Sequence, residues 1–257
     1  ATCLAVTATA TERVRQDIKQ TLHIADADEF IASFDRENLF LAVESNNGSV
    51  KQILDFLQDH KNEAGFIYCN TRKEVDSLAE KLTDYGWPAL PYHAGLDNTT
   101  RQRNQRRFIL EEGLVIVATI AFGMGINKSN VRFILHNGLP KNLENYYQQI
   151  GRAGRDGLRA DCLLLYSGQD VGTIQYFINQ QDQSQRPGAW ARLRAMLAYT
   201  ETAQCRRIPL LAYFGETAKA GTCDMCDNCL DNQVIEKDDI TIPAQKFLSC
   251  VARTGHI

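Results

Sequence analysis

Short apolar runs alternate with longer amphipathic stretches over residues 1–170 of this 257-residue chain. Strands buried on both faces of a sheet have nearly continuous apolar sequences, and their alternation with helical stretches is typical of parallel strands joined by helical crossovers. We therefore predict an α/β fold built on a parallel sheet with flanking helices. The predicted strands are Leu4–Thr7, Leu39–Val43, Gly65–Cys69, Ala89–Tyr92, Leu114–Ala118, Arg132–His136 and Cys162–Tyr166.

The stretches between these runs carry recognisable helix starts. Ser49 precedes a run that places Ile53 and Leu57 on one helical face. Thr71 and Glu74 have the spacing of a capping box, in which each side chain satisfies a free backbone N–H of the first turn. We expect helices to begin after Ser49 and after Thr71.

The pattern changes after residue 170, because residues 171–214 show helical periodicity without a strand-like run. The polar stretch Asn179–Arg186, followed by Pro187-Gly188, indicates a domain boundary. The expected division is a sheet domain over residues 1–178, a small helical subdomain over 179–235 and the start of a further domain over 236–257. A length of 257 residues is ordinary for two domains.

The net charge of −3 offers no general electropositive footprint for nucleic acid. The acidity is local, however, because Asp224–Asp239 holds six acids and one lysine, whereas four arginines lie between Arg101 and Arg107. We expect those four to form a solvated helix face, with the steering of phosphate as the alternative. The longest apolar run, Leu114–Phe122, is far shorter than the roughly 20 residues that cross a bilayer. No membrane partner and a cytoplasmic location are expected.

A glycine-rich segment contains the densest chemical signal. A helix starting near Asn142 would place Gln148, Arg152 and Arg155 at i, i+4 and i+7 on one face. Arginine keeps its charge and binds phosphate in a planar fork, so this set suits a transferring γ-phosphate. The alternative is a solvated, arginine-rich helix end.

The eight cysteines fall into two groups. Three have the spacing Cys223-x-x-Cys226-x-x-Cys229, and Cys205 can complete a tetrahedral, structural Zn²⁺ site. An iron–sulfur cluster has the same ligand set, whereas a disulfide framework is not expected in a cytosolic chain. The remaining four are predicted to be buried thiols: Cys3, Cys69, Cys162 and Cys250.

Five collinear blocks resemble motifs of superfamily 2 helicases, in the wording of the RecQ DNA helicase family. They cover nearly the whole chain. They are Thr7–Ala10 (motif III), Ser33–Leu39 (the block after it), Tyr68–Arg72 with Tyr92–Leu96 (motif IV), Val117–Lys128 (motif V) and Gln148–Gly157 (motif VI). The zinc module of that family is matched by Cys205-Arg206-Arg207, Tyr213-Phe214-Gly215-Glu216 and the cysteine cluster.

The resemblance implies that the sheet domain is the second RecA-like lobe of an ATP-driven motor, with Arg152 or Arg155 as arginine finger and Gln148 beside them. It further implies a zinc module and, from residue 239, the start of a winged helix. Two positions depart from the family pattern, because Asn127 and Gln149 stand where acids are usual. The other implied contacts are Gly123, Gly125 and Asn127 with ATP, and Asn70, Thr71, Arg72 and Thr119 with DNA phosphates.

The expected activity is that of a 3′→5′ DNA helicase serving recombination, repair, replication and the SOS response. ATP with Mg²⁺ would be shared with a first lobe, since no Gly-Lys pair of a Walker A motif occurs in this sequence. This fragment alone is therefore expected to be inactive. The expected partners are single-stranded, forked or junction DNA and single-stranded-DNA-binding protein. Two alternatives are a non-catalytic, zinc-stapled DNA-binding or docking module and another superfamily 2 motor, such as an RNA-dependent ATPase.

Overall fold

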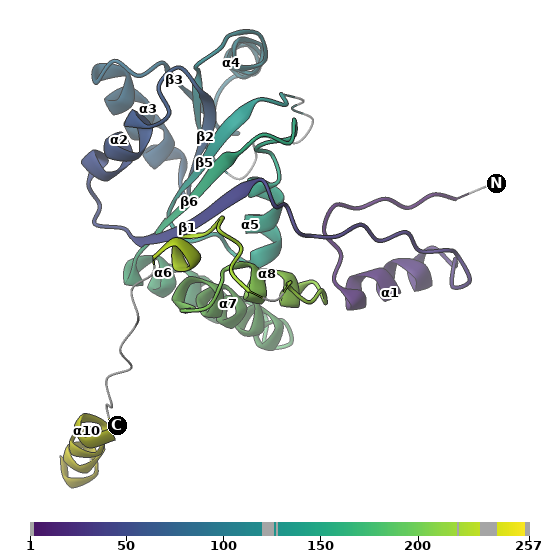
Figure 1. Cartoon of the computed structure of the whole chain (residues 1–257), viewed down its shortest axis with the longest axis vertical. Coiled ribbons are helices and arrows are strands. Elements are labelled where there is room, and N and C mark those ends of the chain that lie inside the picture. Colours follow the sequence, from purple (N-terminus) through teal and green to yellow (C-terminus); the bar gives the residue numbers. More distant parts are fainter. Residues whose placement is uncertain (1–2, 120–125, 127, 220, 232–240, 255–257) are drawn as a thin grey trace.

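The computed structural model describes residues 3–119, 126, 128–219, 221–231 and 241–254 (Figure 1). Within these residues, six parallel strands form one sheet in the order β1-β6-β5-β2-β4-β3. The strands are β1 Leu39–Ser45, β2 Ala64–Cys69, β3 Ala89–Tyr92, β4 Val115–Ala118, β5 Val131–Asn137 and β6 Ala160–Tyr166. The helices are α1 Glu12–Thr21, α2 Val50–Gln58, α3 Arg72–Asp84, α4 Asn98–Leu110, α5 Leu143–Ile150, α6 Gly168–Asn179, α7 Arg186–Glu201, α8 Arg207–Tyr213, α9 Asp227–Leu230 and α10 Thr241–Thr254.

The predicted parallel α/β fold is confirmed, and six of the seven predicted strands are present. Their ends agree within two residues. The seventh prediction, Leu4–Thr7, is wrong. These residues pair with no strand of the described sheet, and Leu4 and Val6 are 84% and 85% exposed. An apolar run becomes a strand only where a neighbouring edge can accept its backbone hydrogen bonds.

Successive residues of each strand alternate between two cores. On β2, Ile67 packs with the buried faces of α2 and α3, whereas Phe66 and Tyr68 pack in the other core with α4 and α5. Figure 1 shows α2 and α3 on one side of the sheet and α5 to α8 on the other. The sheet therefore forms the middle layer of a three-layer domain.

Both predicted helix starts are present. The Ser49 side chain caps α2 by accepting from the backbone N–H of Lys51, and Thr71 with Glu74 forms the capping box of α3. The arginines of α4 are largely solvated, as expected: Arg103 and Arg106 are exposed, and Arg107 pairs with Glu111.

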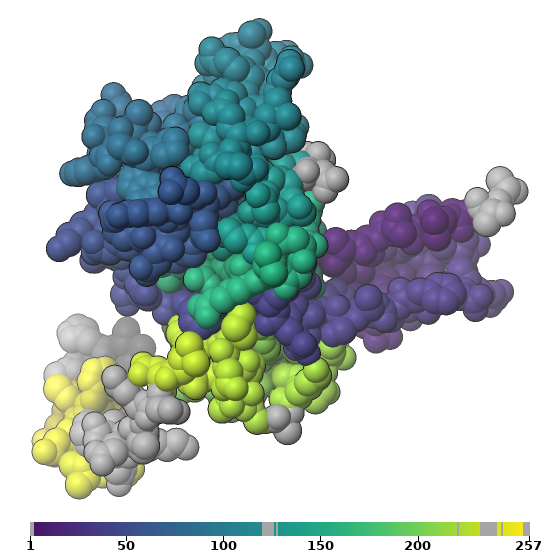
Figure 2. Space-filling model, turned by 45° about the horizontal axis from the view of Figure 1, so that its top comes forward, coloured from purple at the N-terminus to yellow at the C-terminus, as the bar shows by residue number. Residues whose placement is uncertain are grey.

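The helical C-terminal part shares a core with the sheet domain. Tyr199 of α7 and Tyr146 of α5 are buried and joined by a hydrogen bond of 3.0 Å between their hydroxyl groups. Figure 2 shows this module, yellow-green, packed against the body, and an N-terminal arm (residues 3–32, purple) extending from its side. The boundary near residue 179 stays a prediction.

Two further sequence expectations meet the structure here. Cys69 and Cys162 are buried as predicted, but Cys3 and Cys250 are exposed, because the segments that hold them do not enter the core. In the described part of the chain, no helix combines the length and the apolar character that crossing a bilayer requires.

Candidate functional site

The segment that carries Arg152 and Arg155 is a turn and not a helix. Asn142 caps α5 as predicted, but α5 ends at Ile150, and residues 151–157, here called the arginine turn, continue in turns. Gly154 and Gly157 have φ of +55° and +81°, a left-handed conformation that favours glycine. The predicted single helix face of Gln148, Arg152 and Arg155 is therefore wrong, because the helix stops before either arginine.

The arginine turn concentrates positive charge. Partial burial, and then the neighbouring Arg152 and Arg36 guanidinium groups, lower the pKa of Arg155. Arg155 donates to the carbonyl of Ile126 at 2.8 Å and forms no salt bridge in the described part of the chain. Asp156, the acid of the turn, is held instead by Arg132 at 2.6 Å. The positive charge of Arg155 is therefore not neutralised by a carboxylate of the described residues, and an anion beside it would be stabilised.

Tyr68 of β2 lies next to the same two arginines. Burial raises the pKa of Tyr68 to about 12, while the Arg152 and Arg155 cations oppose that shift. The phenol is therefore neutral at pH 7, and the side chain of the sheet that lies next to the arginine turn is polar but uncharged.

Gln148 occupies the exposed side of α5 and reaches the N-terminal arm. Its amide nitrogen donates to the Thr9 hydroxyl at 2.6 Å. The structure thus brings together two segments that the sequence analysis compared with different motifs, Thr7–Ala10 and Gln148–Gly157.

Gln149, one residue further, is buried and was not predicted as part of any site. Its side-chain oxygen accepts from Nε2 of His136 on β5 at 2.7 Å. Burial lowers the pKa of His136 to about 4, against the opposing effect of that hydrogen bond. The position that usually holds an acid therefore makes a neutral hydrogen bond here.

The predicted DNA contacts lie at the carboxyl ends of neighbouring strands. Asn70, Thr71 and Arg72 follow β2, and Thr119 follows β4, which pairs with β2. The helix start after Thr71 is not a vacant anion site, however. The Glu74 carboxylate accepts from the backbone N–H groups of Asn70 and Thr71, each at 3.1 Å. A carboxylate of the chain itself therefore already binds the backbone N–H groups of two of the predicted DNA contacts.

The predicted ATP contacts Gly123, Gly125 and Asn127 lie outside the described residues.

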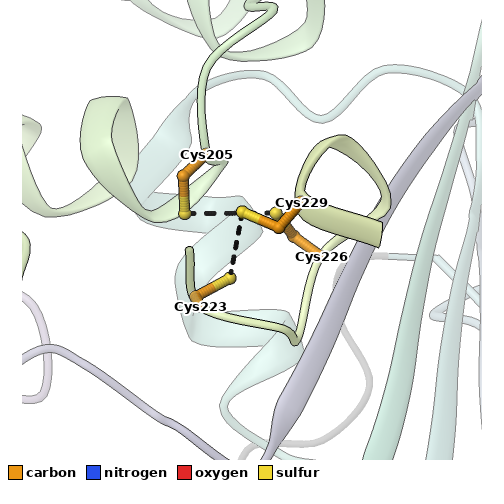
Figure 3. A group of neighbouring side chains, drawn as sticks. All are labelled: Cys205, Cys223, Cys226 and Cys229. Atoms are coloured by element: carbon orange, nitrogen blue, oxygen red, sulfur yellow. Dashed lines mark hydrogen bonds between the residues drawn. The ribbon is translucent and has the colours of Figure 1, made fainter. Parts of the chain in front are cut away.

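The four predicted metal ligands converge (Figure 3). Cys205 precedes α8, and the other three come from the loop around α9. All four Sγ atoms lie within 4.8 Å of one another, with 3.8 Å between Cys223 and Cys229 and 4.0 Å between Cys226 and Cys205. Zn–S bonds of about 2.3 Å in a tetrahedron place sulfurs about 3.8 Å apart. The sulfurs therefore fit a tetrahedral soft cation, and their separations exclude disulfides among the four.

The cysteine loop is anchored to the sheet. The backbone N–H of Leu41 on β1 donates to the backbone carbonyl of Met225 at 3.1 Å. The backbone N–H of Val43 donates to the Asp227 carboxylate at 2.9 Å. Asp227 also receives both prongs of the buried Arg206 guanidinium, at 2.6 and 2.8 Å. A bidentate pair of this kind fixes orientation as well as charge.

Both parts of the chain match families of known proteins. Residues 48–157 match the helicase conserved C-terminal domain, and residues 168–230 match the RecQ zinc-binding family. The chain is 41% identical over 251 residues to the ATP-dependent DNA helicase RecQ of Bacillus subtilis, covering 97% of this chain and 42% of that protein. It is 40% identical over 253 residues to the RecQ-like DNA helicase BLM of Xenopus laevis, covering 93% of this chain and 18% of that protein.

Among solved structures, S. cerevisiae Dbp5 bound to RNA and ADP BeF3 has a similar fold. The TM-score is 0.55 at 19% identity, over 67% of this chain and 47% of that one. This likeness concerns the fold alone.

The parallel sheet, the matched helicase domain and the converging cysteines together define a helicase lobe followed by a zinc-binding module. The chain spans about two fifths of the length of its Bacillus relative. By its 41% identity over nearly its whole length and its matched domains, it belongs to the RecQ family of helicases.

Proposed function

We propose that the intact protein is an ATP-dependent 3′→5′ DNA helicase in which this sheet domain acts as the second RecA-like lobe. ATP with Mg²⁺ is its substrate and lies between this lobe and a first lobe that carries the Walker motifs. The arginine turn faces the γ-phosphate, where Arg152 or Arg155 stabilises the charge that spreads over the transferring group.

One observation carries this assignment. The Arg155 side chain lies near two other guanidinium groups, those of Arg152 and Arg36, and no salt bridge joins it to a carboxylate among the described residues. Such a cluster is costly until an anion arrives, so a bound γ-phosphate would relieve the repulsion where hydrolysis needs positive charge.

The test uses the full-length enzyme with Arg152→Ala and Arg155→Ala. We expect one or both variants to bind ATP about as tightly as the wild type and to lose about 10³-fold or more of DNA-stimulated turnover. Arg159→Ala is the matched control, since Arg159 is exposed and pairs with Asp161 at 2.9 Å. Near-normal turnover in both arginine-turn variants would refute the proposal.

DNA is proposed to cross the carboxyl ends of β2 and β4. Arg72 is exposed there, and Thr119 follows the adjacent strand. Asn70 and Thr71 contribute through the same helix start, although Glu74 shares their backbone donors. Motif V, with Gly123, Gly125 and Asn127, is proposed to join this path to ATP.

Cys205, Cys223, Cys226 and Cys229 are proposed to hold one structural Zn²⁺. When bound, the ion would cross-link α8 to the loop around α9 and supply folding energy, without chemistry on the substrate.

Forked or junction DNA and single-stranded-DNA-binding protein are the proposed partners, acting in the cytoplasm in recombination and repair. The competing assignment is a nucleic-acid-dependent ATPase that prefers RNA. Turnover of the full-length enzyme, stimulated in parallel by DNA and by RNA of the same sequence, separates the two: the proposal requires stronger stimulation by DNA.

A further inference from the structure

Residues 33–38, here called the bridging segment, form an extended stretch before β1 that the proposed function leaves without a role. Arg36 donates from one guanidinium nitrogen to the carbonyls of Ala153 and Gly154, at 3.1 and 3.0 Å. Asn38 donates to the carbonyls of Gly154 and Leu158, at 2.9 and 2.8 Å. Two side chains of the bridging segment therefore hold the backbone of the arginine turn from outside.

These contacts matter because the arginine turn has few internal restraints. It contains two glycines with positive φ, and Gly157 donates to Gly154 at 3.0 Å as one of its few internal backbone bonds. Glycine loses more conformational freedom on ordering than any other residue. A turn of this kind needs partners beyond the turn to keep its two guanidinium groups in place, and its carbonyls receive theirs from Arg36 and Asn38.

The zinc-binding module holds the other side of the bridging segment. The buried Arg207 of α8 pairs with Asp35 at 3.1 Å and donates to the carbonyls of Arg36, Glu37 and Leu39. Glu216 accepts from the Ser33 hydroxyl at 2.5 Å and from the Phe34 backbone at 2.6 Å.

Aromatic packing reinforces this junction. The Phe34 ring stacks on Phe214 with 4.6 Å between centroids and meets the edge of Tyr147 of α5 at 5.8 Å. The Tyr147 hydroxyl also donates to the Phe34 carbonyl at 2.9 Å. The bridging segment is thus clamped between the zinc-binding module and α5, the helix that leads into the arginine turn.

We propose that the bridging segment positions the arginine turn for ATP hydrolysis: Arg207 and Glu216 fix the segment, and Arg36 and Asn38 transmit that position to residues 151–157. Arg36 and Glu216 are positioning residues, because neither needs to touch nucleotide. The proposal rests on the proposed function of the arginine turn. It makes the zinc-binding module part of the geometry of the ATP site, through a chain of contacts that does not include the metal.

The test compares variants of the full-length enzyme in which different contacts of the bridging segment are changed. Arg36→Lys keeps the charge but is shorter and lacks the rigid guanidinium plane that directs one nitrogen to the carbonyls of Ala153 and Gly154. Glu216→Ala breaks the far end of the bridge, and Glu216→Gln keeps two of its acceptor lone pairs. Lys219→Ala is the matched control, because Lys219 pairs with Glu37 at the same junction with both side chains exposed.

For Arg36→Lys and Glu216→Ala, we expect DNA-stimulated kcat to fall about tenfold or more while KM for ATP stays within about twofold. Amide hydrogen exchange should rise selectively in residues 151–158, with zinc content and melting temperature close to the wild type. Glu216→Gln should recover most of the loss, and Lys219→Ala should match the wild type in every readout.

Unchanged amide exchange in residues 151–158, or a rise spread evenly over the zinc-binding module, would refute the claim that the bridging segment restrains the arginine turn. Raised exchange with unchanged kcat would overturn its role in turnover, provided that Arg152→Ala or Arg155→Ala lowers kcat. If neither of those two variants lowers kcat, the proposed function fails, and exchange in residues 151–158 still decides whether the bridge restrains the turn.

Discussion

The side-chain oxygen of Gln149 accepts a hydrogen bond of 2.7 Å from Nε2 of His136 inside the sheet domain. The Tyr68 ring stacks on the imidazole with 5.3 Å between centroids. Nδ1 of His136 is buried and has no hydrogen-bond partner in the described part of the chain. The histidine is therefore neutral at pH 7, and its pKa is about 4 because burial outweighs the hydrogen bond.

Gln149→Glu should raise the pKa of His136 by about 1–3 units, because a carboxylate at hydrogen-bond distance stabilises the imidazolium. Titration of the imidazole resonances by NMR measures this shift directly. Gln148→Glu is the control, since Gln148 is the exposed neighbour on α5. An unchanged pKa in Gln149→Glu would contradict the pairing.

Because the pKa of His136 is lowered, we expect the folded protein to lose stability in mild acid. Between about pH 6.5 and pH 4 the unfolded chain binds a proton at this site that the folded chain does not. The free energy of unfolding does not depend on this histidine above pH 6.5, and it falls by about 3 kcal/mol as the pH drops to 4. Urea unfolding across this range should show a weaker pH dependence in His136→Phe than in the wild type. Equal slopes would show that His136 titrates normally.

Strands were predictable from sequence because apolar runs mark β1 to β6, most completely in β2 and β4, where every residue is buried. Leu4–Thr7 has the same composition but no neighbouring strand, a property that composition does not encode. Gly151 ends α5, whereas the spacing of Gln148, Arg152 and Arg155 predicts a helix that continues through it. The contacts of Arg36 with Gly154 and of Glu216 with Phe34 join residues over 100 positions apart. Such pairs follow from the sheet topology and have no local signal.

Cys226→Ser should lose one equivalent of bound zinc and lower the melting temperature, because structural zinc contributes about 10–16 kcal/mol of apparent binding free energy in small zinc domains. Elemental analysis for zinc and iron, with thermal unfolding, measures both effects. Cys3→Ser, which changes an exposed cysteine, is the control. Iron in place of zinc, or a full zinc content in Cys226→Ser, would contradict the assignment.

Arg206→Ala should destabilise the module by about 3 kcal/mol, because it leaves the Asp227 carboxylate without its bidentate partner. Chemical denaturation gives the change in the free energy of unfolding. Lys219→Ala removes an exposed partner instead and should leave the denaturation midpoint where it is. Equal effects of the two substitutions would mean that burial of Arg206 is energetically unimportant.

Arg72→Ala in the full-length enzyme should weaken DNA binding and reduce the slope of log K against log salt by about 0.7–0.9, the value for one phosphate contact. Fluorescence anisotropy at several salt concentrations measures this slope. Lys51→Ala, an exposed cation at the start of α2, controls for the loss of one charge. A slope identical to that of the wild type would remove Arg72 from the DNA path.

The outer strand β1 gains its second neighbour from the cysteine loop, through Leu41 with Met225 and Val43 with Asp227. An uncovered strand edge is a template for pairing with another chain, and β1 is seven residues long and largely apolar. Release of the loop would expose this template. The loop that carries Cys223, Cys226 and Cys229 therefore also covers the edge of β1, so the order of the cysteine cluster and the protection of this strand from pairing with a second chain are linked.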